Sequence, residues 1–189
     1  TVKVGSLAMD ANKLSLAGNN YDINSLVMID PVFAQYSYKG ARPKDTTQKA
    51  EAPVVINKDS LLMWNRGGMA LKIANLKIQN GVFRSDQQTD RAAYDYFDGQ
   101  HIYFSEINAA FSNATLKGDT ILSNLSLSAK ERSGFEVKSM TANMKLMPTG
   151  MAFNDLDLKT NRSTIRNSFM MAYNDMSEMG DFIHKVRMA

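Results

Sequence analysis

The chain of 189 residues contains no cysteine, only four prolines and only two histidines. Without cysteine, the protein has no disulfide framework and no thiolate for catalysis or metal binding. His101 and His184 lie far apart in the sequence, and no paired-ligand motif surrounds either, so we expect both to be structural or surface residues. No apolar run approaches the roughly 20 residues that a membrane-spanning helix needs.

Motifs that support catalysis are missing as well. No phosphate-binding loop, nucleophile elbow or zinc-ligand spacing occurs. Asp86, Asp90, Asp95 and Asp98 do not follow the spacing of a calcium-binding loop. The net charge is only +3, and the 22 basic residues are scattered among 19 acidic ones, so we expect no nucleic-acid partner. We therefore expect a protein that is not an enzyme and that uses no metal and no cofactor.

The sequence does contain a repeated pattern, apolar-x-apolar-x-polar-apolar-x-apolar. Its seven copies, of which the fifth is weaker, begin at Val2, Tyr21, Leu71, Ile102, Thr120, Phe135 and Met151. Alternation predicts β-strands with one apolar face, but the fifth position shifts the alternation by one residue. A β-bulge there would keep both halves of each strand facing the same side. We expect such bulges at Ser6, Ser25, Asn75, Glu106, Asn124, Ser139 and Asp155.

Turn-forming residues separate the copies, for example Lys117-Gly118-Asp119 and Pro148-Thr149-Gly150. The last four copies start 18, 15 and 16 residues apart, which leaves room for a strand and a tight turn but not for a crossover helix. We therefore predict one mainly β domain over residues 1–189. It should be a strongly bent, mostly antiparallel meander sheet, shaped as a U-shaped trough or an open barrel-like layer.

Three segments interrupt the strand pattern. Residues 37–52 contain glycine, proline and mixed charge and are interpreted as a mobile loop, and residues 84–92 as a shorter loop. In residues 175–187, Asp175 and Glu178 resemble a capping box, and apolar residues follow at helical spacing. This segment predicts a short C-terminal helix that covers an edge or end of the sheet.

The apolar face of such a sheet needs a cover. Leaving its large apolar side chains in water would cost tens of kcal/mol, at roughly 1.5–3 kcal/mol each. Either the face packs on itself in a closed sandwich or barrel, or an open trough holds something apolar and linear, such as acyl chains. Methionine and phenylalanine are frequent on this face, and methionine adapts to irregular partners. The candidate trough residues, which would serve equally well as a core, are Leu71, Ile73, Leu76, Ile78, Phe104, Ile107, Leu125, Leu127, Phe135, Val137, Met140, Phe153 and Leu156.

Three stretches carry a resemblance to a known family: Leu71 to Phe83, Ser133 to Gly150, and Asp181 to Arg187. In this order they resemble the TamB-like branch of the AsmA-like superfamily, which are envelope proteins of Gram-negative bacteria. The resemblance covers about residues 71–187 and would make this chain a segment of a longer protein. It implies a U-shaped β-trough that binds phospholipid or another acyl-chain lipid for transport between the inner and outer membranes.

The resemblance also implies a periplasmic location and a BamA-like outer-membrane protein as a partner in outer-membrane biogenesis. The full-length protein would be anchored in the inner membrane through a part that is not in this chain. No catalytic residues follow from the family. Two other functions stay open: a binding module that captures client β-strands during outer-membrane protein assembly, and a closed β-sandwich that acts only as a spacer.

Overall fold

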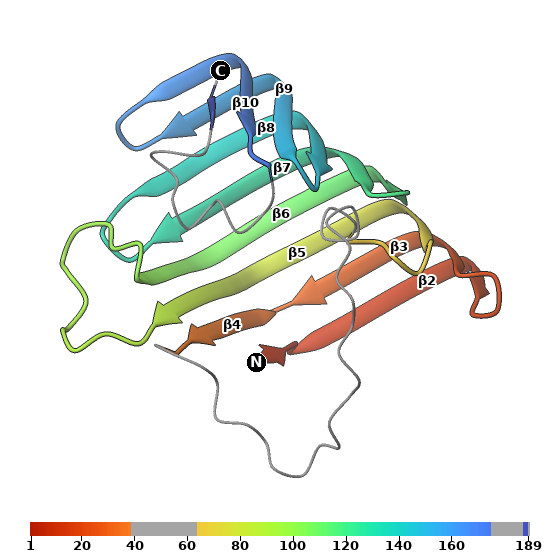
Figure 1. Ribbon diagram of the computed structural model, residues 1–189, viewed down its shortest axis with the longest axis horizontal. Helices are drawn as coiled ribbons and strands as arrows, with labels where there is room; N and C mark the ends of the chain where they lie inside the picture. The colour runs from red at the N-terminus through yellow and green to blue at the C-terminus, as the bar shows by residue number, and fades with distance from the viewer. Residues whose placement is uncertain (39–63, 175–186, 189) are drawn as a thin grey trace, which may run out of the picture.

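The computed structural model describes residues 1–38, 64–174 and 187–188, and the regular structure within them is entirely β (Figure 1). The first strands are β1 (Val2–Lys3), β2 (Ser6–Ser15), β3 (Asn20–Ile29) and β4 (Val32–Ser37). The middle of the chain forms β5 (Ala70–Gln87), β6 (His101–Lys117), β7 (Thr120–Glu131) and β8 (Glu136–Met147). The last strands are β9 (Gly150–Thr160), β10 (Thr164–Ala172) and β11 (Arg187–Met188).

All described strands belong to one sheet. At one edge β1 pairs with β4 and β2 pairs with β3, and both β3 and β4 then pair in parallel with β5. From β5 to β11 every neighbouring pair is antiparallel. The mostly antiparallel meander predicted from the turns is confirmed, whereas the parallel pairing of β3 and β4 with β5 was not expected.

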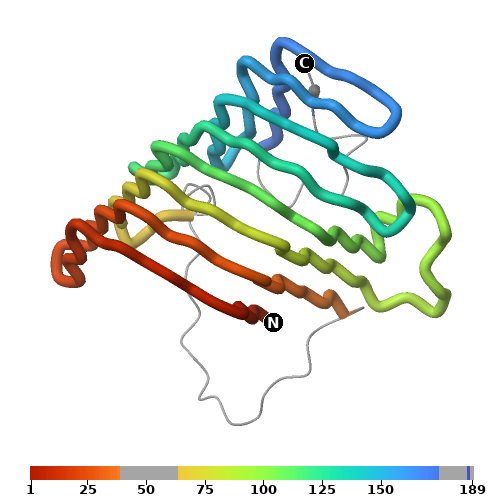
Figure 2. Tube along the Cα trace, turned by 180° about the vertical axis from the view of Figure 1, so that it is seen from behind, coloured from red at the N-terminus to blue at the C-terminus, as the bar shows by residue number. Residues whose placement is uncertain are grey.

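The sheet is a single open layer. Among the described residues, every contact between strands joins neighbours in the sheet, so no two strands face each other as they do in a sandwich or a closed barrel. Viewed from both sides, the layer is curved and its strands curl over at one end (Figures 1 and 2). The open, bent layer is therefore confirmed, and the closed β-sandwich is not what these strands form.

A line of polar residues crosses the sheet at right angles to its strands. We call this line the polar ladder, because each member lies directly opposite the next. Its members are Asp10, Ser25, Asn75, Ser112, Asn124, Asn143, Asn154 and Ser168. Side-chain amides link neighbouring strands along it, as where Asn124 Nδ2 donates to Ser112 Oγ at 3.4 Å. The ladder defines the polar face of the sheet.

Backbone irregularities beside the polar ladder form a first bulge line. Register shifts occur at Asn24 of β3, Asn113 of β6, Asp155 of β9 and Asn167 of β10. The last three have φ values of 53°, 50° and 93°, a region that asparagine and aspartate tolerate better than most residues. The expected bulge at Asp155 is confirmed, and the one expected at Ser25 lies at the preceding residue, Asn24. At Asn75 the pairing with β3 and β6 continues without a register shift. The reason is that the apolar alternation of β3 and β6 shifts at the same level as that of β5.

A second bulge line crosses the long strands farther along, and it was not predicted as a separate line. It contains Asp30, Asn80, Glu106 and Ser139. The first three have φ values near 50°, and Asn80 Nδ2 donates to Asp30 Oδ1 at 2.6 Å. The expected bulges at Glu106 and Ser139 are therefore confirmed, on this line. Because a bulge bends its strand, two lines divide the sheet into three bands.

Besides Asn75, two more of the seven expected bulges differ. At Asn124 the prediction is wrong, because β7 keeps an unbroken alternation and register with β8 from Ile121 to Leu127. Leu122, which the pattern counted as apolar, is 45% exposed and lies opposite Lys145 on the polar face. At Ser6 an interruption between two strands replaces the bulge, since β1 ends at Lys3 and β2 begins at Ser6.

Three predicted segment boundaries also change. Arg84 to Gln87 continue β5 instead of forming a loop, because they pair with β4 on one side and β6 on the other. Ser37 is the last residue of β4, and most of the predicted loop 37–52 lies outside the described residues. The predicted helix 175–187 is not seen: 175–186 lie outside the described residues, and Arg187 pairs with Ala172 at the free edge of β10.

Candidate functional site: an apolar face without a cover

The face opposite the polar ladder is apolar in continuous rows. One row runs across eight strands, each residue lying directly opposite the next. It contains Leu14, Tyr21, Leu71, Leu116, Ile121, Leu146, Met151 and Met171. A second row contains Leu7, Met28, Ile78, Ala109, Leu127, Met140, Leu158 and Ile165. The two bulge lines thus keep the apolar side chains on one face, as the repeat predicts.

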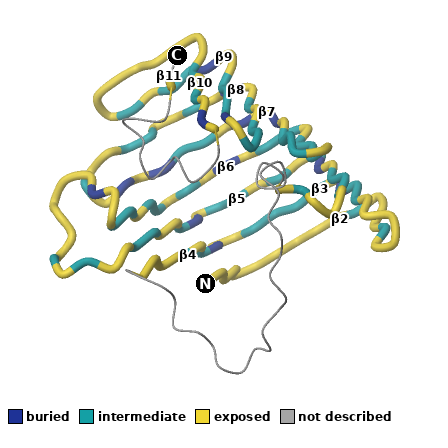
Figure 3. The backbone as a smooth tube through the Cα atoms, viewed as in Figure 1, coloured by how far each residue is buried: buried dark blue, intermediate teal, exposed yellow. Residues whose placement is uncertain are grey.

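Residues of the middle strands are more buried than those of β2 and β10 near the two edges (Figure 3). Ile73, Leu125 and Leu156 are buried, although no described strand packs over the face. Side chains converge there: a Cβ added to Gly81 would lie 3.1–3.4 Å from the side chains of Ile78, Ile107 and Pro31. Crowding of this kind is expected on the concave side of a curved sheet, where neighbouring side chains shield one another.

The structure brings most of the thirteen candidate trough residues together on the apolar face. Ile78, Leu127 and Met140 lie in the second row, and Leu71 lies in the first. Leu76 and Leu125 lie on either side of Phe111 in a third row between them. Ile73 pairs with Ile23 and Ala114.

The β9 candidates continue this surface toward the other edge. Phe153 pairs with Met144 and stacks on Phe169 with ring centroids 6.4 Å apart. Leu156, beside the bulge at Asp155, is 4% exposed. The apolar face therefore reaches β10.

The remaining candidates lie beyond the second bulge line. Ile107 pairs with Gly81, and Val137 pairs with Ala129. Phe104 pairs with Phe83 and with Glu131. Phe135, which precedes β8, is 39% exposed and does not belong to any apolar row.

Phe104 and Phe135 line an open hollow of about 640 Å³ at this end of the sheet. Its other lining residues are Asp95, Tyr96, Phe97, Ser133 and Arg162. They come from the loop before β6, the β7–β8 turn and the β9–β10 turn, which antiparallel pairing brings to the same end. We call this region the aromatic hollow.

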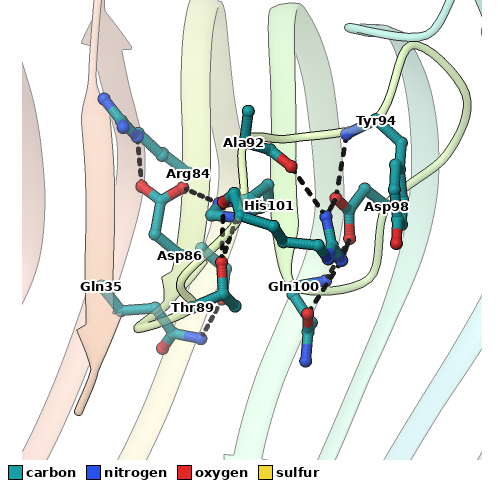
Figure 4. A network of polar contacts seen from close by, with 11 residues as sticks. Gln35, Arg84, Asp86, Thr89, Ala92, Tyr94, Asp98, Gln100 and His101 are labelled. Atoms are coloured by element: carbon teal, nitrogen blue, oxygen red, sulfur yellow. Dashed lines mark hydrogen bonds and ion pairs between the residues drawn. The ribbon is translucent and has the colours of Figure 1, made fainter. Parts of the chain in front are cut away.

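The loop that carries the aromatic residues is held by a buried ion pair. The two guanidinium nitrogens of Arg91 donate to the carboxylate of Asp98 at 2.6 and 3.0 Å, and the Asp98 side chain is 3% exposed. The backbone N–H groups of Tyr94 and Gln100 donate to the same carboxylate (Figure 4). The Arg91 guanidinium and these N–H groups hold the pKa of Asp98 well below its usual value.

A second polar cluster joins the ends of β5 and β6 next to this loop. Asp86 forms an ion pair with Arg84, and His101 Nδ1 lies 3.1 Å from Asp86 Oδ1 (Figure 4). Partial burial raises the pKa of Asp86, but hydrogen bonds with His101 and Arg84 outweigh it and leave the pKa below its usual value. These groups are all engaged with one another, so we interpret the cluster as structural.

No family model, curated protein or solved structure matches this chain. The resemblance drawn from the sequence therefore stays a prediction, and function has to be argued from the surface itself. Within the described segments, no helix has the length and hydropathy to cross a bilayer, and no group of three or more metal-ligating residues comes together.

The sequence pattern did not identify most of the aromatic hollow. Tyr96, Phe97 and Arg162 lie in loops outside every copy of the repeat, so strand alternation gives no information about them. The cluster Tyr94-Asp-Tyr-Phe97 was the available signal, because three aromatic residues in four positions are unusual for a surface loop.

Proposed function

We propose that this chain is a segment of a periplasmic AsmA/TamB-like protein that binds acyl chains along its apolar face. The full protein would then transport phospholipid between the inner and outer membranes of a Gram-negative bacterium, and a BamA-like protein would be its partner. The observation that carries the proposal is the unbroken apolar row from Leu14 to Met171 on an open single-layer sheet. The chain's own resemblance to that family is consistent with it.

The shape of the surface suits an extended ligand better than a compact one. An open layer gives an acyl chain a continuous path across neighbouring strands, which lie about 4.8 Å apart. Met140, Met144, Met151 and Phe153 lie along this path, and thioether side chains adapt to a partner that slides. Binding would be passive, driven by removal of apolar area from water, with the head group at the open side of the trough.

Mass spectrometry of an organic extract tests the proposal. The protein, purified without detergent, should carry phospholipid in stoichiometric amounts, and the lipid should be lost after a wash with cyclodextrin. A protein that is monomeric, folded and free of lipid, and that takes up none from vesicles, would contradict acyl-chain binding.

The free edge of β2 favours a second candidate function, capture of a client β-strand. Among the described strands β2 pairs only with β3, so its other side presents unpaired backbone groups. Leu7, Met9 and Leu14 on this strand are 51–60% exposed. A client strand with alternating apolar residues could extend both the hydrogen-bond ladder and the apolar rows.

Binding of a labelled peptide from an outer-membrane β-strand separates the two candidates. If β2 captures clients, Ala8→Lys, on the polar face of this strand, should weaken peptide binding and leave lipid loading unchanged, since a charged edge residue opposes strand addition. Equal peptide binding by the wild type and this variant would exclude the edge of β2 as the capture site.

A further inference from the structure

The aromatic hollow is lined by one cation and one anion that have no partner among the described residues. In the described part of the chain, neither the Arg162 guanidinium nor the Asp95 carboxylate forms an ion pair or side-chain hydrogen bond. Both residues are exposed, and they lie on different loops. Most of the remaining lining residues are aromatic: Tyr96, Phe97, Phe104 and Phe135.

The hollow is built from loops that are fixed in place. The guanidinium carbon of Arg91 lies over the Tyr94 ring, 3.8 Å from the ring centroid. The Tyr94 ring in turn stacks on the Tyr96 ring, with centroids 4.9 Å apart. The buried pair of Arg91 and Asp98 closes this loop. Tyr96 and Phe97 nevertheless stay 65% and 55% exposed. Aromatic side chains that are held rigidly but left in water provide a preorganised binding surface.

The other two loops are tied to each other. Asn161 Nδ2 donates to the Gly134 carbonyl at 2.7 Å, and the Asn161 backbone N–H donates to the Glu136 carbonyl at 3.0 Å. These bonds fix the turn carrying Arg162 against the turn carrying Ser133 and Phe135. The Ser133 N–H in turn donates to Glu131 Oε2 at 2.7 Å, while Glu131 Oε1 is buried without a hydrogen bond in the described structure.

The balance of charge around the hollow decides which head group fits. Among the described lining residues, Asp95 is the only acidic one and Arg162 is the only basic one. A purely anionic head group would gain one favourable contact and meet one carboxylate. A zwitterion can place its anion at Arg162 and its cation at Asp95, and the ring of Tyr96 also attracts an ammonium group.

We propose that the aromatic hollow is a head-group site for a zwitterionic amphiphile, which rests on the proposed acyl-chain function of the adjoining face. The phosphate lies at Arg162, the ammonium group lies between Asp95 and Tyr96, and the alkyl chain passes over Phe104 and Phe135 toward the apolar rows. The volume of about 640 Å³ is within the range of small-molecule sites.

Three amphiphiles with the same alkyl chain test this assignment: dodecylphosphocholine, dodecyl phosphate and dodecyltrimethylammonium. Their affinities are measured by calorimetry below the micelle concentrations, and the wild type should bind the zwitterion most tightly. Arg162→Gln should weaken binding of the two phosphates about fivefold and leave the ammonium compound unchanged. Asp95→Asn should weaken binding of the two ammonium compounds by a similar factor and leave dodecyl phosphate unchanged.

Lys117→Gln is the matched control, because it removes one positive charge at the opposite end of β6. It should leave all three affinities unchanged. Equal effects of Arg162→Gln on all three compounds, or none on any, would overturn the head-group site while leaving acyl-chain binding in place. Failure of the wild type to bind any of the three would overturn both proposals.

Discussion

Ile23 and Ile73 lie directly opposite each other in the parallel pair of β3 and β5, although they are 50 residues apart in the sequence. They are the third positions of two copies of the repeat. Six of the other seven positions of these copies also pair with their equivalents, from Tyr21 with Leu71 to Met28 with Ile78. Parallel pairing in equivalent register places the phase shifts of both strands side by side. The apolar side chains of both strands therefore stay on one face.

Gly150 offers a direct test of strand packing at the β9–β10 edge. A Cβ added there would lie 2.6 Å from the backbone carbonyl oxygen of Met171, which cannot move without displacing β10. Gly150→Ala should therefore lower the free energy of unfolding by about 1–3 kcal/mol, measured by urea denaturation.

Gly99 is the control for this substitution, because nothing lies within 4 Å of an added Cβ and its φ is not in the left-handed region. Gly99→Ala should leave stability unchanged or raise it by up to about 1 kcal/mol. Equal stability of the Gly150→Ala variant and the wild type would show that β9 and β10 are farther apart than described.

Asn113 tests the first bulge line. Its φ of 53° is costly for a β-branched residue and free of cost for glycine. Asn113→Val should destabilise the protein by about 1–2 kcal/mol, whereas Asn113→Gly should change stability by less than about 0.5 kcal/mol. Ser126→Val, at an exposed regular position on neighbouring β7, serves as the control and should not destabilise. If valine is tolerated at position 113, the bulge is not at this residue.

The buried pair of Arg91 and Asp98 should make stability depend on acidity. The pKa of Asp98 is lower in the folded protein than the value of about 3.9 expected after unfolding. The ionised Asp98 carboxylate therefore contributes to the free energy of unfolding at pH values above its pKa in the unfolded chain. This contribution is lost as the pH falls through that value toward the pKa in the folded protein. Between pH 6 and pH 3 the melting temperature of the wild type should fall more than that of Asp98→Asn. Parallel curves for the two proteins would contradict the assignment.

Phe153 separates a ligand-binding surface from a purely structural core. Phe153→Asp should leave a folded β protein, because this side chain lies on an uncovered face, but should reduce lipid loading several-fold by placing a charge in the trough. Asn154→Asp is the matched control, since it adds the same charge on the opposite face. Loss of the circular dichroism signal with Phe153→Asp alone would indicate that the residue is core.

Strand alternation was sufficient to predict the sheet, its curvature and its apolar face, because period-two patterning depends only on local residue order. It could not distinguish the two bulge lines, because the same position of the repeat lies on either of them. The fifth position is Asp155 on the first line and Glu106 on the second. Asn124 misled the pattern because Leu122 is an apolar residue on the polar face. Tyr96 and Arg162 line the same hollow only because the sheet brings three connecting segments to one end, and no local sequence pattern encodes that arrangement.

The most direct measurement uses the absence of cysteine in the chain. Single cysteines are introduced at Met140 and Thr141, adjacent residues that point to the apolar and polar faces, and each is labelled with a polarity-sensitive fluorophore. On titration with phospholipid vesicles, emission from the label at position 140 should shift to the blue while emission from position 141 stays constant. No shift at position 140, or equal shifts at both positions, would contradict acyl-chain binding on the apolar face.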